Sequence, residues 1–248
     1  MKKQGGYEAS AHLYDLFDSK ENVDFFAHYA ERAGEILDIG AGTGRIAVPL
    51  ARRGAIVTCV EPSPAMRAEF ERKLAEEPEL RRRITLIDGE AKSFDAGRTF
   101  TAAFLSGSFD HLLDDEERVS ALTNVNRHLS LGGVLIFDVF LGLMKDTPLS
   151  PAGVVPTDLG EVRRFVGGRT LSGGKKETRL VFEVYERGTL VERIEERSLV
   201  GITNRPAIHG FLERAGFEVR REWGDYDFTP YQEGASLLIV EAVKIEPV

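Results

Sequence analysis

The chain has 248 residues, with 32 Lys and Arg against 40 Asp and Glu, which gives a formal net charge of −8 at pH 7. This length allows one large domain, or one domain with a substantial addition. The single cysteine, Cys59, excludes an intramolecular disulfide framework and a multi-cysteine metal site, so we expect no metal. The N-terminus has no apolar signal segment and no run is long enough for a membrane helix, which predicts a cytoplasmic protein without a membrane partner. The acidic balance argues against a nucleic-acid partner, since binding its phosphates needs clustered Lys and Arg.

The first 140 residues alternate short apolar runs with amphipathic stretches. These predict strands at 35–40, 56–61, 84–87, 100–105 and 134–140, and helices at 45–53, from Ser63 onward, and at 114–129. Ser63 is expected to cap its helix, with Pro64 in the first helical position. Residues 204–244 return to this style, with a helix at 204–215 and strands at 217–220 and 236–244. Such alternation predicts an α/β fold with a parallel sheet covered on both faces.

The character of the chain changes after residue 140. Residues 141–160 are rich in proline and glycine, which predicts a loop or linker. Three runs follow, at 161–166, 177–186 and 190–199, and we interpret them as antiparallel hairpins with one solvated face, although the third has enough charge to pass for a helix. We therefore predict an N-terminal helical cap (1–34), an α/β domain (35–140 and 204–248), and a β-rich subdomain (141–203) inserted into it.

A glycine-rich turn follows the first predicted strand. Gly40, Gly42 and Gly44 remove Cβ atoms where the strand turns into a helix, so a ligand can approach the backbone. In an open α/β sheet this turn lies at the carboxyl end of a strand, where ligands bind. An ordinary glycine turn is the alternative. A dinucleotide-binding loop fits poorly, because Arg45 stands where that motif needs its last glycine.

Glu61 ends the second predicted strand, 17 residues after Gly44. A carboxylate at this place can accept hydrogen bonds from two vicinal ribose hydroxyls, as the acidic residue does after a Rossmann glycine loop. An acid at a strand end is otherwise often a solvated residue. The glycine turn nearby favours the ribose interpretation.

In this order, the segments 36–45, 61–63, 88–91 and 129–133 resemble the motifs of class I S-adenosylmethionine-dependent methyltransferases. The resemblance implies a Rossmann-like, seven-stranded, mostly parallel sheet whose last strand is antiparallel, with S-adenosyl-L-methionine as the cofactor. It also implies which residues contact each part of the cofactor. The methionine part would meet Asp38 and the backbone of Gly40, Ala41, Gly42 and Gly44, the ribose would meet Glu61 beside Pro62, the adenine would meet Met66, Gly89, Glu90 and Ala91, and the sulfonium would face Leu105 and Ser106. Glu90 departs from the aspartate that is usual in the family.

The segment 106–112 bears on the methyl acceptor. Nucleic-acid amino methyltransferases carry Asn/Asp-Pro-Pro-Tyr/Phe here, and this chain does not. The segment instead resembles small-molecule methyltransferases, including bacterial N-methyltransferases of amino sugars and heterocycles. Those relatives also often carry an N-terminal Tyr-Asp like Tyr14-Asp15, which implies that Tyr14 could cover the cofactor. His111 is the candidate base or acceptor ligand, because the ordinary pKa of histidine lies near neutrality. A structural histidine, and a tyrosine on the apolar face of a helix, are the alternatives.

The sequence thus predicts methyl transfer to a small molecule, at nitrogen in preference to oxygen. Two other hypotheses stay open. One is a nicotinamide-dependent oxidoreductase, and the other is a non-catalytic protein of the same fold that binds a cofactor. The sequence does not distinguish a monomer from a homodimer.

Overall fold

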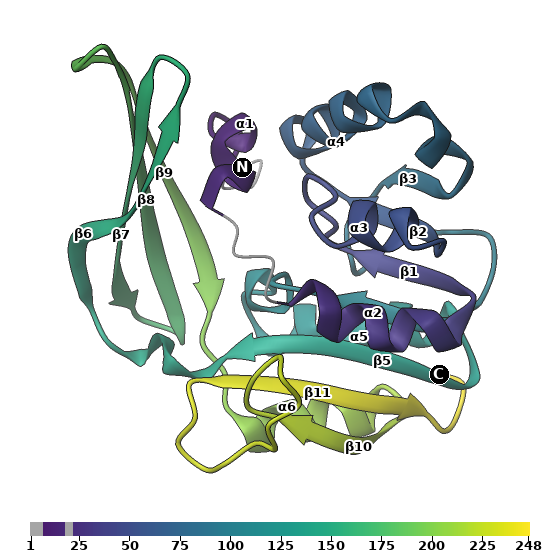
Figure 1. Cartoon of the computed structure of the whole chain (residues 1–248). Coiled ribbons are helices and arrows are strands. Elements are labelled where there is room, and N and C mark those ends of the chain that lie inside the picture. The colour runs from purple at the N-terminus through teal and green to yellow at the C-terminus, as the bar shows by residue number, and fades with distance from the viewer. Residues whose placement is uncertain (1–6, 18–21) are drawn as a thin grey trace.

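The computed structural model describes residues 7–17 and 22–248. Its main sheet has seven strands in the order β10-β11-β5-β4-β1-β2-β3 (Figure 1). The strands are β1 (Glu35–Ile39), β2 (Ile56–Glu61), β3 (Ile84–Asp88), β4 (Phe100–Leu105), β5 (Leu129–Phe140), β10 (Phe217–Trp223) and β11 (Leu237–Lys244). Strands β1 to β5 pair in parallel, and β11 pairs antiparallel with both β5 and β10. The predicted sheet, with its antiparallel last strand, is confirmed.

Helices cover both faces of this sheet. They are α2 (Val23–Ala33), α3 (Ala47–Arg52), α4 (Pro64–Glu76), α5 (Asp115–Arg127) and α6 (Arg205–Arg214). The first three bury apolar side chains such as Phe25, Leu50 and Phe70 in one core, while α5 and α6 bury Leu122 and Leu212 in a second core on the other face. Two buried faces explain why the central strands are apolar without alternation.

The predicted helix starts at Ser63 and Asn204 are confirmed, and each residue caps its helix. The Ser63 hydroxyl accepts a hydrogen bond from the Met66 N–H at 3.2 Å, and Pro64 occupies the first position of α4. At α6, the Asn204 side chain accepts from the Ala207 N–H at 3.0 Å. Each cap satisfies an N–H that the first helical turn leaves without an intrahelical acceptor.

The inserted region forms a separate antiparallel sheet in the order β6-β7-β8-β9 (Figure 1). Its strands are β6 (Thr147–Thr157), β7 (Gly160–Leu171), β8 (Lys175–Glu186) and β9 (Thr189–Gly201). The predicted hairpins are therefore present. The prediction of a loop over 141–160 was wrong, because a short helix (η4, Leu141–Met144) and strand β6 fill it. Proline is tolerated in β6 because this edge strand pairs only with β7.

Strand β5 begins earlier than predicted. The predicted helix ends at residue 129 and the predicted strand starts at 134, and the glycines at 132 and 133 between these ranges lie inside β5. The pairing between β4 and β5 shifts in register between Phe100 and Ala102, and Gly132 has a φ of +78° at this irregularity. The glycine signal marks a bulge within the strand rather than a boundary.

The N-terminal segment, residues 7–17, lies between the inserted sheet and α4 (Figure 1). It contains α1 (Ala11–Tyr14) and a short helix, η1 (Asp15–Phe17). Leu13 packs with Val162, Phe182 and Ile194 of the inserted sheet, and the Ala9 N–H donates to Glu196 of β9 at 2.7 Å. The segment therefore bridges the two sheets. Within residues 7–17 and 22–248, no helix is long and apolar enough to cross a membrane.

Candidate functional site

The turn between β1 and α3 combines tight packing with one open position. Gly40, Gly42 and Gly44 have φ angles of +72°, +58° and +81°. A Cβ atom on Gly44 would lie 2.4 Å from the Phe70 ring, so this glycine lets α4 pack against the turn. A Cβ atom on Gly42 would meet nothing within 4 Å among the described residues. The backbone at Gly42 is thus approachable from outside, as a ligand-binding turn requires.

Glu61 points from the end of β2 toward this turn. Its carboxylate accepts the Gly42 N–H at 2.8 Å and the Ser63 N–H at 2.8 Å. The residue is 7% exposed, and burial raises the pKa of its carboxyl group, while both backbone donors oppose that rise. The carboxylate is therefore held in a fixed orientation beside the open backbone of Gly42.

Asp38, in β1, carries a buried oxygen without a protein partner. The residue is 2% exposed, and among the described residues its Oδ2 atom has no hydrogen bond. Burial raises the pKa of this carboxyl group to about 7; Arg45 acts to lower it and Glu61 to raise it. An unpartnered buried carboxyl oxygen is costly, and a cationic or hydrogen-bonding ligand would satisfy it.

A hydrogen-bond network around Asp138, in β5, was missed by the sequence analysis. Asp138 accepts the Gly107 N–H at 2.6 Å and the Tyr226 hydroxyl at 2.8 Å. Ser106, a predicted site residue, approaches the same carboxylate at 3.4 Å and accepts from Arg45 at 3.2 Å. An acid in the otherwise apolar run 134–140 was the available signal. The network fixes the segment that follows β4, which packs directly against the glycine turn at Gly40.

The N-terminal segment is fastened to the glycine turn. Asp15 accepts the Thr43 hydroxyl at 2.7 Å and forms an ion pair with Lys73 of α4. Earlier in the same segment, the Glu8 carboxylate accepts a hydrogen bond from the Ser63 hydroxyl at 2.9 Å, close to Glu61. These contacts place the N-terminal segment over the region that Glu61 and the turn define.

The predicted catalytic residues Tyr14 and His111 are brought near each other through Tyr7. The Tyr7 ring lies 5.1 Å from the Tyr14 ring and 6.1 Å from the His111 ring, in edge-on geometry in both cases. His111 is exposed and belongs to the short helix η3 (Phe109–His111), just after β4. Tyr7 carried no sequence signal, because it lies outside any recognisable motif.

The residues predicted to contact adenine, together with Pro62 beside the ribose, lie in α4 and in the segments that follow β2 and β3, whose ends pair. Met66 is buried, Pro62 is exposed, and a Cβ atom on Gly89 would lie 2.9 Å from Phe94. Glu90 is exposed and forms an ion pair with Lys92 at 3.1 Å. Two further predicted residues complete the placement. Ala91 is half-buried, and Leu105 is buried in the core at the end of β4.

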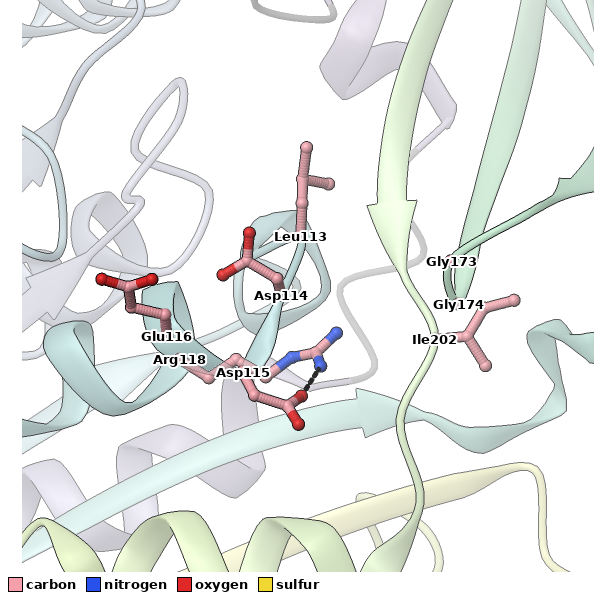
Figure 2. A pocket seen from close by; sticks show the side chains of 8 residues that line it. All are labelled: Leu113, Asp114, Asp115, Glu116, Arg118, Gly173, Gly174 and Ile202. Carbon is pink, nitrogen blue, oxygen red and sulfur yellow. Dashed lines mark hydrogen bonds and ion pairs between the residues drawn. The ribbon is translucent and has the colours of Figure 1, made fainter.

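Two cavities flank this region, and only one of them adjoins the predicted residues. A cavity of about 310 Å³ lies between the N-terminal segment, Arg45 and the inserted sheet, and it is lined by Tyr7, Tyr14, Phe17, Arg45, Arg164, Val166, Leu180 and Phe182. A larger one, of about 460 Å³, lies where α5 starts beside the β7–β8 turn. Figure 2 shows its acidic rim and the Arg118–Asp115 ion pair. No residue of the predicted site lines this larger cavity.

Comparison with known proteins shows which sequences this chain resembles. Residues 36–133 match the family described as "Methyltransferase domain". A Bacillus cytotoxicus protein named as an uncharacterized methyltransferase is 32% identical over 144 residues, which are 54% of this chain and 65% of that protein. The chain thus spans just under two thirds of this relative.

Solved structures resemble the chain over nearly its whole length. An S-adenosylmethionine-dependent methyltransferase from Clostridium acetobutylicum superposes with a TM-score of 0.79 at 18% identity, over 96% of this chain and 98% of that one. A sugar N-methyltransferase from a Streptoalloteichus species gives a TM-score of 0.75 at 25% identity, over 94% and 93%. These alignments include the inserted sheet.

The fold is therefore that of the class I S-adenosylmethionine-dependent methyltransferases. The sequence match covers residues 36–133, which hold the glycine turn, Glu61, the segment 88–91 and the segment after β4, and these residues are similar to the family described as "Methyltransferase domain". The resemblance inferred from the sequence is confirmed.

Proposed function

We propose that the protein transfers a methyl group from S-adenosyl-L-methionine to a small molecule, at nitrogen. One observation carries the cofactor assignment: the unpartnered, buried Oδ2 atom of Asp38 lies in the strand that leads into the open turn at Gly42. The amino-acid part of the cofactor carries an ammonium group, which a buried carboxylate stabilises. The residues present fit the cofactor.

The other parts of the cofactor have matching groups. Glu61 is oriented to accept hydrogen bonds from ribose hydroxyls, since its carboxylate already faces the turn. Met66 supplies a buried apolar surface for adenine, with Glu90 and Ala91 at the end of the next strand. Leu105 and Ser106 lie at the end of β4, on the side where the methyl group would be presented.

The cofactor, when bound, supplies a methyl group on a good leaving group. The protein then contributes mainly proximity and alignment for an in-line displacement. Asp38 and Glu61 hold the cofactor, the N-terminal segment closes over it, and Tyr14 and His111 face the acceptor. An amine nucleophile must lose one proton, and His111, being exposed, can pass that proton to solvent.

Two observations favour a small acceptor with a nitrogen nucleophile. The likeness to the sugar N-methyltransferase extends over 93% of that chain, including its counterpart of the inserted sheet. The segment 106–112 also lacks the proline-proline motif of nucleic-acid amino methyltransferases. We infer that the N-terminal segment and the inserted sheet together form the acceptor site, as a substrate subdomain.

Calorimetric titration with S-adenosylhomocysteine tests the cofactor assignment first. We expect saturable binding, and no detectable binding up to millimolar ligand would overturn the proposal. Titration with a nicotinamide dinucleotide is the matched control, because binding of that ligand alone would favour an oxidoreductase. A panel of small amines, assayed by mass increase of the acceptor, then tests transfer. Tight cofactor binding with no transfer to any acceptor would favour a non-catalytic role.

A further inference from the structure

The cavity beside the glycine turn has an apolar body. Phe17, Leu180 and Phe182 contribute its walls, and the rings of Phe17 and Phe182 lie 5.7 Å apart. Val166 of β7 completes the side formed by the inserted sheet. At about 310 Å³, the cavity is large enough for a small organic molecule.

Arg164, in β7, places a guanidinium group in this apolar setting. One of its nitrogens, Nη2, donates to the Ala152 carbonyl at 3.1 Å, and the guanidinium carbon lies 4.7 Å from the centre of the Phe17 ring. Its Nε atom is buried and has no hydrogen-bond partner in the described part of the chain. Burial also lowers the pKa of Arg164.

The five other arginines on the strands of the inserted sheet behave differently. Each forms an ion pair with a glutamate on the same sheet: Arg163 with Glu161, Arg169 with Glu177, Arg179 with Glu195, Arg193 with Glu183, and Arg197 with Glu195. Within residues 7–17 and 22–248, Arg164 has no carboxylate at ion-pair distance. Arg164 is half-buried, and a partly desolvated cation with a covered, unpartnered Nε atom and no counter-charge is costly to keep, so a ligand that supplies the charge is favoured.

Another part of the cavity lining comes from residues next to the glycine turn and from the N-terminal segment. Arg45, which directly follows the glycine turn, contributes a second guanidinium there, held by the Asn22 side chain at 2.6 Å. Tyr14 lies on the same cavity. A molecule held by Arg164 would thus span from the inserted sheet to the groups proposed to face the reaction.

We propose that Arg164 binds an oxyanion of the methyl acceptor, a carboxylate or a phosphate, while Phe17, Leu180 and Phe182 contact its apolar part. This inference rests on the proposed function, since it names the chemical class of the acceptor. Guanidinium groups pair with carboxylate and phosphate in a charge-assisted geometry that neutral groups cannot reproduce. The acceptor would therefore be an amine that also carries an acidic group.

Ligand-detected NMR titrations of the protein saturated with S-adenosylhomocysteine test this without an identified acceptor. The probes are benzoate, phenyl phosphate and benzamide, which is neutral and nearly isosteric with benzoate. We expect at least one anionic probe to bind about tenfold more tightly than benzamide, as expected when a charged hydrogen bond is gained. The preferred anion identifies the acidic group as a carboxylate or a phosphate.

Two variants complete the design. Arg164→Gln should abolish the preference for the anion, and Arg164→Lys should keep part of it because the charge remains. The matched control is Arg163→Gln, whose side chain does not line the cavity and pairs with Glu161. That variant should bind all three probes like the parent protein.

The inference is overturned if benzamide binds as tightly as both anions, if none of the probes binds, or if Arg164→Gln keeps the preference. Binding of S-adenosylhomocysteine is measured first in every variant. If the parent protein does not bind S-adenosylhomocysteine, the proposed function is overturned. If it binds S-adenosylhomocysteine but shows no selectivity for the anionic probes, this inference alone is overturned. A folded Arg164→Lys variant keeps the test decisive even where Arg164→Gln fails to fold.

Discussion

The Glu61 carboxylate accepts the backbone N–H of Gly42 at 2.8 Å, which joins the end of β2 to the turn after β1 across 19 residues of chain. Glu61 is therefore oriented before any ligand arrives. Since Gly42 is also the open position of the turn, a ligand that approaches its backbone meets a carboxylate whose position is already fixed. Preorganisation of this kind lowers the entropic cost of binding.

Replacement of Glu61 by alanine should weaken binding of S-adenosylhomocysteine by about tenfold or more. Hydrogen bonds to a charged group contribute about 1.5–3 kcal/mol, which corresponds to that change in affinity. Calorimetric titration measures it. Glu71→Ala is the matched control, because Glu71 is an exposed residue of α4 that pairs with Arg81 and belongs to no predicted cofactor contact. Equal affinity of the parent and Glu61→Ala proteins would refute the ribose assignment.

Alanine at two positions of the glycine turn should give opposite patterns. Gly42→Ala should lower the free energy of unfolding by only about 1–2 kcal/mol, the cost of a left-handed backbone at a non-glycine residue. It should nevertheless impair S-adenosylhomocysteine binding, because the methyl group enters the open space over the turn. Urea denaturation and calorimetry measure the two effects.

Gly44→Ala should instead act mainly on stability. Its Cβ atom would lie 2.4 Å from the Phe70 ring, so overpacking adds about 1–3 kcal/mol to the backbone cost. We expect a larger loss of unfolding free energy than for Gly42→Ala. Equal stability of the two variants would contradict the packing role of Gly44.

The parts of the site that could be predicted from the sequence are formed by residues close together in the chain. The glycine turn, Glu61 and the cap at Ser63 each depend on a few neighbouring residues, so their spacing is readable without the fold. The Asp138 network was not readable in this way. It joins Asn22, Arg45, Ser106 and Tyr226, which lie on separate elements, and only folding brings them together.

The inserted sheet shows a different reason why a sequence-based prediction of secondary structure can fail. The prolines of residues 147–157 predict a loop by composition, and the structure has strand β6 there. A sequence pattern cannot reveal that a strand will lie at the edge of a sheet, where a missing N–H costs little. The run 177–186 was predicted correctly because β-branched and aromatic residues, as at Val181, Phe182 and Val184, are frequent in it.

Asp15 should control how firmly the N-terminal segment closes over the site. Asp15→Ala removes the acceptor for the Thr43 hydroxyl and the ion pair with Lys73. We expect faster hydrogen exchange of the amides in residues 8–17 and weaker S-adenosylhomocysteine binding, with little change in global stability. Asp24→Ala is the control, since Asp24 pairs with Arg53 on the surface of α2. Unchanged exchange in Asp15→Ala would show that other contacts hold the segment.

Binding of S-adenosylhomocysteine should release a proton from Asp38 near neutral pH. Burial raises the pKa of this carboxyl group to about 7, so much of it is protonated at pH 6. An arriving ammonium group stabilises the charged form and expels the proton. Affinity should therefore rise with pH up to about 7 and then level off, and calorimetry in buffers of different ionisation enthalpy counts the protons released.

The same raised pKa has a consequence for the stability of the free protein. Between the unfolded pKa of Asp, about 3.9, and about 7, the native state binds the extra proton, so the contribution of Asp38 to unfolding free energy falls as pH rises through this window. Asp38→Asn removes the titrating group, and the variant should show both a flatter stability profile and less proton release. Asp110 and Glu61, whose pKa values burial also raises, stay in both proteins, so the difference between parent and variant isolates Asp38. Identical proton release in the two proteins would assign the titration to another carboxyl group and remove Asp38 from the ammonium site.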